Sequence, residues 1–170
     1  MSIPLYGANK DGNAADKALN GGFGPDAGTD LADSTAAVVM TSDDFGKTFM
    51  CLLDGASKTV TLPASVGEDD IGKQIKIIQQ VDLVASGVLI VLTGASNTFA
   101  GNSYAMGVGI DEFRPAEANN KVTITGANTN SAWGENSTLV ATVVGIGEYM
   151  VEIDAKALGN GSDAIAFATV

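Results

Sequence analysis

The amino-acid sequence predicts an all-β fold, an antiparallel β-sandwich or jelly roll of about eight strands with an extended N-terminal arm. Short segments alternate apolar and polar residues with period two, as in KTVTLPAS at 58–65, where Val60 and Leu62 alternate with threonines. Glycine accounts for 21 of the 170 residues and recurs between these segments, as tight turns require. No segment carries a convincing helical period of 3.6.

Residues 1–34 differ in composition from the rest of the chain. They are rich in Gly, Asp, Asn and Ala, and their scattered hydrophobic residues supply no buried face. We therefore expect an arm over 1–34 that orders only against another protein, followed by a β-sandwich domain over 35–170. Leu5, Tyr6 and Phe23 are the candidate partner contacts of this arm.

The expected strands follow in order, separated by Gly-rich turns, at 36–42, 47–54, 58–65, 73–81, 87–95, 120–127, 137–156 and 165–170. The segment 137–156 reads as two strands joined in a tight hairpin, where Gly145 and Gly147 can take a positive φ. Pro63 closes its strand or confines it to an edge. The span between 95 and 120 is long and loop-like, which favours a functional insertion or a partner-facing loop at 101–120.

Charge excludes several classes of partner. Nine Lys and Arg face twenty Asp and Glu, giving a net charge of −11, which a phosphate backbone and an anionic membrane surface both repel. No apolar run is long enough to span a membrane, and the N-terminus lacks a signal-peptide layout. We expect no nucleic-acid or membrane partner, and assembly in a cytosol-like compartment. Charged residues make up only 17% of the chain, which suits a surface covered by other subunits.

The residue types needed for common catalytic chemistry are scarce. The chain has no histidine, which removes the commonest general base and zinc ligand. Cys51 is the single cysteine and is expected to be a small buried hydrophobic residue. Arg114 is the single arginine, so a cluster of bidentate phosphate ligands is excluded. We therefore expect a protein that is not an enzyme, with no catalytic residues, cofactor or metal.

One pair of acidic residues has a spacing that is compatible with catalysis. Glu152 and Asp154 are two residues apart on a strand and share one face, about 7 Å apart, a separation that glycosidases use. The alternative is that Tyr149, Val151 and Ile153 take the core side while the two acids simply face water. The second alternative is favoured, because nothing nearby separates the two carboxyl pKa values.

A calcium site is suggested by GGFGPDAGT at 21–29, which nearly matches a calcium-binding nonapeptide. However, Gly28 stands where that motif needs a large apolar residue, and the motif occurs only once, so a flexible arm is favoured. The acidic run at 68–70 could also hold calcium, but a solvated charge run is the favoured interpretation.

Two aromatic residues stand in Gly-, Asn- and Ser-rich turns. Tyr104 and Trp133 could stack on a sugar or anchor a protein contact. Each could equally plug an end of the sandwich, and the sequence leaves both alternatives open.

A family resemblance covers residues 58–154. Its elements are Thr61-Leu62-Pro63, Gly72-Lys73 with Ile75, the apolar strand from Val88 to Leu92, the turn from Gly94 to Gly101, and Trp133. Together they resemble the β-sandwich modules of head-decoration, fibre and knob proteins of tailed bacteriophages. The resemblance implies an oligomeric, often trimeric, non-enzymatic particle protein.

The expected function is thus a virion structural protein, a capsid decoration or cement protein on the outer head surface. Its expected partners are capsid protein or other virion subunits and further copies of itself, with a homotrimer favoured, assembled in the host cytoplasm. The alternative is a fibre or knob-type adhesin domain that binds host-surface glycans through Tyr104 and Trp133. Deleting residues 1–34 is expected to leave a folded sandwich that no longer binds its particle.

Overall fold

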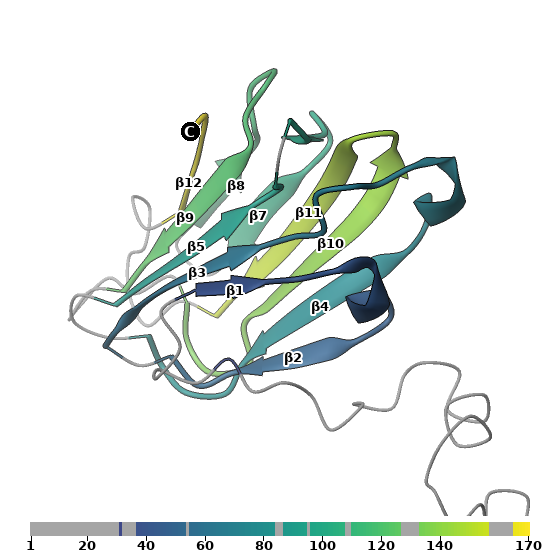
Figure 1. The fold of residues 1–170 in the computed structure, drawn as a ribbon. Coiled ribbons are helices and arrows are strands. Elements are labelled where there is room, and N and C mark those ends of the chain that lie inside the picture. The colour runs from purple at the N-terminus through teal and green to yellow at the C-terminus, as the bar shows by residue number, and fades with distance from the viewer. Residues whose placement is uncertain are drawn as a thin grey trace, which may run out of the picture.

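A computed structural model of the chain describes residues 31, 37–53, 55–83, 87–94, 96–107, 110–126, 133–156 and 165–170. These residues form two mixed β-sheets packed together, with two 3-10 turns and no α-helix among them (Figure 1). The five-stranded sheet has the order β1-β3-β5-β9-β12, and it contains β1 (Ala37–Val39), β3 (Ser57–Thr61), β5 (Val88–Leu92), β9 (Lys121–Thr125) and β12 (Ile165–Ala168).

The other sheet is seven-stranded, with the order β2-β4-β10-β11-β7-β8 and with β6 paired to β11. Its strands are β2 (Thr48–Cys51), β4 (Gln74–Gln79), β6 (Thr98–Phe99), β7 (Tyr104–Gly107), β8 (Ile110–Phe113), β10 (Thr138–Gly145) and β11 (Glu148–Ala155). The prediction of a β-rich fold of two packed layers is confirmed. The described residues hold twelve strands, however, more than the predicted number of about eight.

The prediction that the sheets are antiparallel is wrong, because five of the strand pairs are parallel. β1 pairs with β3, β3 with β5 and β2 with β4, all in parallel register, and β6 and β7 both run parallel to β11. An antiparallel sandwich implies that neighbouring strands run in opposite directions, but β1 to β5 alternate between the two sheets. A chain that crosses from sheet to sheet at each turn returns to the first sheet in the same direction, so neighbours there become parallel.

Residues 96–120 were predicted to be loop, and the structure places β6, β7 and β8 there. β6 and β7 pair with successive segments of the same edge of β11, and a short loop separates them. Where the ladder is interrupted, the buried hydroxyl of Ser103 accepts a hydrogen bond from the backbone N–H of Val151 at 2.9 Å. These strands are two to four residues long, too short for a period-two pattern to be visible.

The core lies between the sheets, where alternate residues of each long strand point inward. On β11 the buried pattern alternates along the strand, and Tyr149, Val151 and Ile153 are fully buried. Leu31 also belongs to this core and forms a parallel bridge with Cys51 at the edge of β2. The predicted arm therefore includes a core residue at position 31.

Each end of the sandwich is closed by a buried polar network. At one end the Trp133 indole N–H donates to Gln79 Oε1 at 2.7 Å, while Gln79 Nε2 donates to two backbone carbonyls. At the other end the Tyr149 hydroxyl donates to the carbonyl of Pro63 at 2.8 Å. Asn97 Nδ2 donates to the carbonyl of the next residue, Ala64, at 3.0 Å. Burial, together with the negative charge of Asp70, raises the pKa of Tyr149 well above its usual range.

Candidate functional site

Two turns that share the pattern D-D-x-G-K and the same local geometry lie at one end of the seven-stranded sheet. They are TSDDFGK at 41–47, which leads into β2, and GEDDIGK at 67–73, which leads into β4. Each contains a 3-10 turn, Ser42–Asp44 in the first and Glu68–Asp70 in the second. Each ends on a glycine with a positive φ, 83° at Gly46 and 89° at Gly72. The pattern D-D-x-G-K thus specifies one local structure twice.

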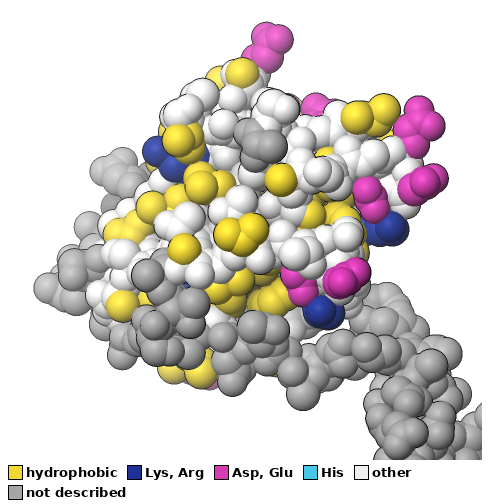
Figure 2. Space-filling view, in the orientation of Figure 1, with side chains coloured by type: hydrophobic (Ala, Val, Ile, Leu, Met, Phe, Trp, Pro, Cys, Tyr) yellow, Lys and Arg dark blue, Asp and Glu magenta, His cyan; other side chains and the backbone are white. Residues whose placement is uncertain are grey.

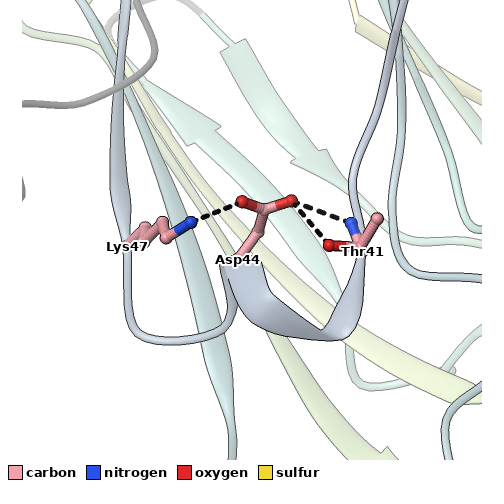
Figure 3. Close-up of polar contacts among 3 residues, drawn as sticks. All are labelled: Thr41, Asp44 and Lys47. Atoms are coloured by element: carbon pink, nitrogen blue, oxygen red, sulfur yellow. Dashed lines mark hydrogen bonds and ion pairs between the residues drawn. The ribbon is translucent and has the colours of Figure 1, made fainter.

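The first turn is held by Asp44 (Figure 3). One carboxylate oxygen accepts hydrogen bonds from Thr41, from its backbone N–H at 2.8 Å and from its hydroxyl at 3.4 Å. The other oxygen accepts from Lys47 Nζ at 2.8 Å. Partial burial by itself raises the pKa of Asp44, but the hydrogen bonds from Lys47 and Thr41 outweigh it and hold the pKa below its ordinary value.

The second turn repeats these contacts. Asp70 accepts from the backbone N–H of Gly67 at 3.0 Å and from Lys73 Nζ at 2.7 Å. The hydrogen bond from Lys73, followed by that from Gly67, lowers the pKa of Asp70. In each turn, therefore, the second aspartate stabilises the turn internally, and the first aspartate remains exposed.

The two turns and the β10–β11 hairpin lie side by side, because β2, β4, β10 and β11 are consecutive neighbours in the sheet (Figure 1). Lys73 Nζ of the second turn lies 5.6 Å from the centre of the Phe45 ring of the first. The backbone N–H of Gly147, in the hairpin, donates to the carbonyl of Val66, just before the second turn. Phe45, Ile71 and Ile146 therefore belong to adjoining turns at this end of the sheet, and the three residues together are called the apolar ridge below.

The apolar ridge is exposed and flanked by acids. Ile71 is 52% exposed and Ile146 is 68% exposed, while Phe45 packs partly against the core. The flanking carboxylates are those of Asp43, Glu68 and Asp69, which are exposed, and Glu148, which is half-buried. Figure 2 shows acidic side chains gathered at this end, at the right of the view. Such an arrangement suits a partner with an apolar pocket and a basic rim.

The structure describes two of the five residues predicted as contacts, Tyr104 and Trp133. Leu5, Tyr6 and Phe23 lie outside the described residues. Trp133 is fully buried, so of the two alternatives left open for it the structure supports the one in which it plugs an end of the sandwich. The prediction of an exposed loop contact at Trp133 is replaced by a structural role, because its indole N–H is held by the buried Gln79.

Tyr104 lies on the outer face of β7, half-buried, and not in a loop. Its hydroxyl donates to Glu152 Oε1 at 3.0 Å, across the parallel pair of β7 and β11. Asp154 on the same face is bound by Lys156 Nζ at 2.7 Å. Tyr149, Val151 and Ile153 take the core side, as the favoured interpretation of this segment predicted.

The sequence interpretation missed the apolar ridge, although a signal for it exists. The pentapeptides DDFGK at 43–47 and DDIGK at 69–73 differ at one position, and comparing the chain with itself would have paired them. Ile146 carries no such signal, because an isoleucine in a hairpin turn can be recognised as a ridge residue only once its neighbours are known.

Comparisons of the chain with protein-family models, with characterised proteins and with solved structures gave no match. The resemblance to phage virion modules therefore rests on the sequence motifs alone. Within the described part of the chain, no helix has the length and hydrophobicity needed to cross a membrane.

Proposed function

We propose that this protein is a non-enzymatic structural component of a tailed-bacteriophage virion, a decoration or cement protein that docks on the outer capsid surface. The proposal is supported by the motif resemblance over residues 58–154 and by a two-sheet scaffold with a buried polar network at each end. The observation that carries it is the apolar ridge, where two exposed isoleucines stand among carboxylates at one end of the molecule.

The apolar ridge supplies both parts of a docking contact. Complete burial of a large aliphatic side chain contributes roughly 1.5–3 kcal/mol. Ile71 is 52% exposed and Ile146 is 68% exposed, so each still has half or more of its surface to bury. The surrounding acids steer the approach of a basic surface and oppose contact with packaged nucleic acid. The N-terminal segment with Leu5, Tyr6 and Phe23 provides a second contact in this proposal.

The first test is location. Particles of the phage whose genome encodes this chain should contain it at a fixed ratio to the capsid protein, measured by quantitative mass spectrometry of purified virions. Absence from the particles would contradict the proposal.

The second test addresses the apolar ridge. Ile146→Lys is expected to weaken binding of the full-length protein to undecorated particles about tenfold or more, since it removes an apolar contact and offers a cation to a basic rim. Leu52→Lys is the matched control, because Leu52 is also an exposed aliphatic residue but follows β2 at the opposite end of the sandwich. Equal binding by both variants would remove the apolar ridge from the contact.

A glycan-binding adhesin remains the second candidate, supported by the half-buried Tyr104 beside Glu152. An aromatic ring next to a carboxylate offers a sugar both a stacking surface and a hydrogen-bond acceptor. Binding of the protein on a glycan array, lost in Tyr104→Ala and kept in Ile146→Lys, would favour this candidate over the decoration protein.

A further inference from the structure

The outward face of the five-stranded sheet has an unusual composition. Its outward side chains form three rows whose members are paired across the strands. Except for Lys121, these side chains are small, aliphatic or hydroxyl-bearing. The set consists of Ala37, Val39, Ser57, Thr59, Thr61, Val88, Ile90, Leu92, Lys121, Thr123, Thr125, Ala166 and Ala168. None of them is acidic. This set is called the threonine–aliphatic face below.

The corresponding face of the seven-stranded sheet is different. Its central row runs across five strands as Thr48, Lys76, Val140, Glu152 and Tyr104. The next row carries Asp154, so this face presents both signs of charge to solvent. Figure 2 shows hydrophobic and uncharged side chains over the middle of the molecule, where β1, β3 and β5 lie in Figure 1, with acidic groups toward the margin.

This contrast indicates what covers the threonine–aliphatic face. A strongly acidic chain, with net charge −11, repels copies of itself over most of its surface. A basic partner would be drawn to the carboxylate-bearing surfaces and gains nothing electrostatically from a face without acids. A face of the same kind matches it best, since aliphatic side chains and threonine methyls can pack and threonine hydroxyls can both donate and accept.

We propose that the threonine–aliphatic face is a self-association surface, occupied by the same face of a second copy of this chain. Two twisted sheets pack face to face with their strands inclined by about 30°. A face that meets the same face of a second copy makes a two-fold, isologous contact, whereas a closed trimer needs two different patches on each subunit. The pairing is therefore dimeric and not the trimer that the family resemblance implies.

The size of the face sets the strength expected. Five strands about 4.8 Å apart, each contributing about five residues at about 3.3 Å, give a planar area of roughly 400 Å² per copy. A standard stable interface buries about 800 Å² per partner. We therefore expect a weak, reversible dimer, with a dissociation constant between about 10 μM and 1 mM.

The inference does not depend on the virion role, because it concerns the protein alone in solution. Sedimentation equilibrium of the full-length protein from about 10 μM to about 1 mM should show a concentration-dependent monomer–dimer equilibrium. Ile90→Lys, at the centre of the face, should raise the dissociation constant at least tenfold, because two like charges meet across the two-fold axis. Val140→Lys is the matched control, also a half-buried aliphatic residue at mid-strand, on the other sheet, and should leave the constant unchanged.

Thr123→Glu provides a second variant on the same face if Ile90→Lys fails to fold, as judged by circular dichroism. A monomer at every concentration, a trimer, or equal effects of Ile90→Lys and Val140→Lys would overturn the proposal. A monomer whose particle binding is lost in Ile90→Lys would instead assign the face to the capsid. Failure of Ile146→Lys to affect particle binding contradicts the role of the apolar ridge in docking but leaves the dimer measurement unaffected. Failure of the docking proposal and failure of the dimer proposal are therefore distinguishable.

Discussion

Gln79 closes one end of the sandwich with a single amide group. Its oxygen accepts from Trp133, and its nitrogen donates to the carbonyls of Leu53 and Val81. A buried amide is tolerated only when its donors and acceptor are satisfied, because an orphaned polar group keeps its full desolvation cost. These hydrogen bonds fix the orientation of Trp133, the largest fully buried side chain of the described core.

Trp133→Phe tests this network. The change keeps an aromatic ring but removes the donor to Gln79 Oε1, so the free energy of unfolding should fall by roughly 2–4 kcal/mol, from the unsatisfied oxygen and the lost ring volume. Chemical denaturation provides the measurement. A loss below about 0.5 kcal/mol, within the range of ordinary surface changes, would show that the hydrogen bond contributes little.

The pKa of Asp44 predicts how the first turn responds to acid. This pKa is lower in the folded protein than the ordinary value of 3.8. The carboxylate therefore stabilises the fold at pH values above that ordinary value, and the contribution disappears as the pH falls through the lower, folded-state pKa.

Asp44→Asn should lower the free energy of unfolding by about 1 kcal/mol at pH 7, because it loses the charge-assisted bond to the partly exposed Lys47. The difference from the unaltered protein should shrink as the pH falls below 3.8 and through the lower, folded-state pKa, because Asp44 then becomes protonated. Urea unfolding between pH 7 and acidic pH measures this difference in the free energy of unfolding. Asp43→Asn is the control, and it should change the free energy of unfolding by no more than about 0.5 kcal/mol. A difference that is constant with pH would contradict the assignment.

At the scale of elements, the two D-D-x-G-K turns show that one local sequence determines one local structure. The first turn joins β1 of the five-stranded sheet to β2 of the seven-stranded sheet. The second turn joins β3 to β4 in the same way. β1 pairs in parallel with β3 in one sheet, and β2 pairs in parallel with β4 in the other. The unit from 37 to 51 is thus repeated structurally by the unit from 57 to 79.

This equivalence predicts matching effects of two glycine substitutions. Gly46→Ala and Gly72→Ala should each destabilise the protein by about 1–2 kcal/mol, because both positions have a positive φ. Among the described residues, no atom beyond the two chain neighbours lies within 4 Å of the added Cβ at either position. The cost is therefore conformational and nearly the same at both sites.

Gly67→Ala is the control for these two substitutions. Gly67 also has open space around its Cβ position, but its φ is −120°, so the change should be nearly neutral. Thermal unfolding of the three variants decides the matter. Clearly unequal losses at Gly46 and Gly72 would show that the turns are not energetically equivalent.

Strand positions were largely predictable at this scale. The alternation around Val60, Val122 and Val151 locates β3, β9 and β11, and the Gly145–Gly147 turn locates the β10–β11 hairpin, in which Gly147 adopts a φ of 70°. Strand pairing was not predictable. A turn such as 41–47 can connect two neighbours within a sheet or cross between sheets, and its own residues do not distinguish the two.

At the scale of the whole molecule, Leu31 marks where the N-terminal segment joins the core. Its backbone N–H donates to the carbonyl of Met50 at 2.9 Å, and its carbonyl accepts from the N–H of Leu52 at 3.2 Å. The side chain is fully buried. A deletion that tests the arm should therefore end at residue 30 and not at residue 34.

Leu31→Ala in the full chain should lower the free energy of unfolding by roughly 2–5 kcal/mol, because it leaves a cavity in the core. Deletion of residues 1–30, which retains Leu31, should keep nearly all of the stability and should weaken particle binding. Differential scanning calorimetry combined with particle co-sedimentation measures both effects. Undiminished particle binding by the shortened chain would exclude the arm from the docking contact.

The sequence by itself determined the β-rich class, the strand positions with strong alternation, and the separation of core from solvent faces. These depend on period-two patterning and turn residues, which act between near neighbours in the chain. Only the tertiary structure decided the parallel pairing, the internal position of Trp133, the apolar ridge and the threonine–aliphatic face. Each of these depends on which distant segments lie next to one another, and that is set by the packing of the two sheets around a shared core.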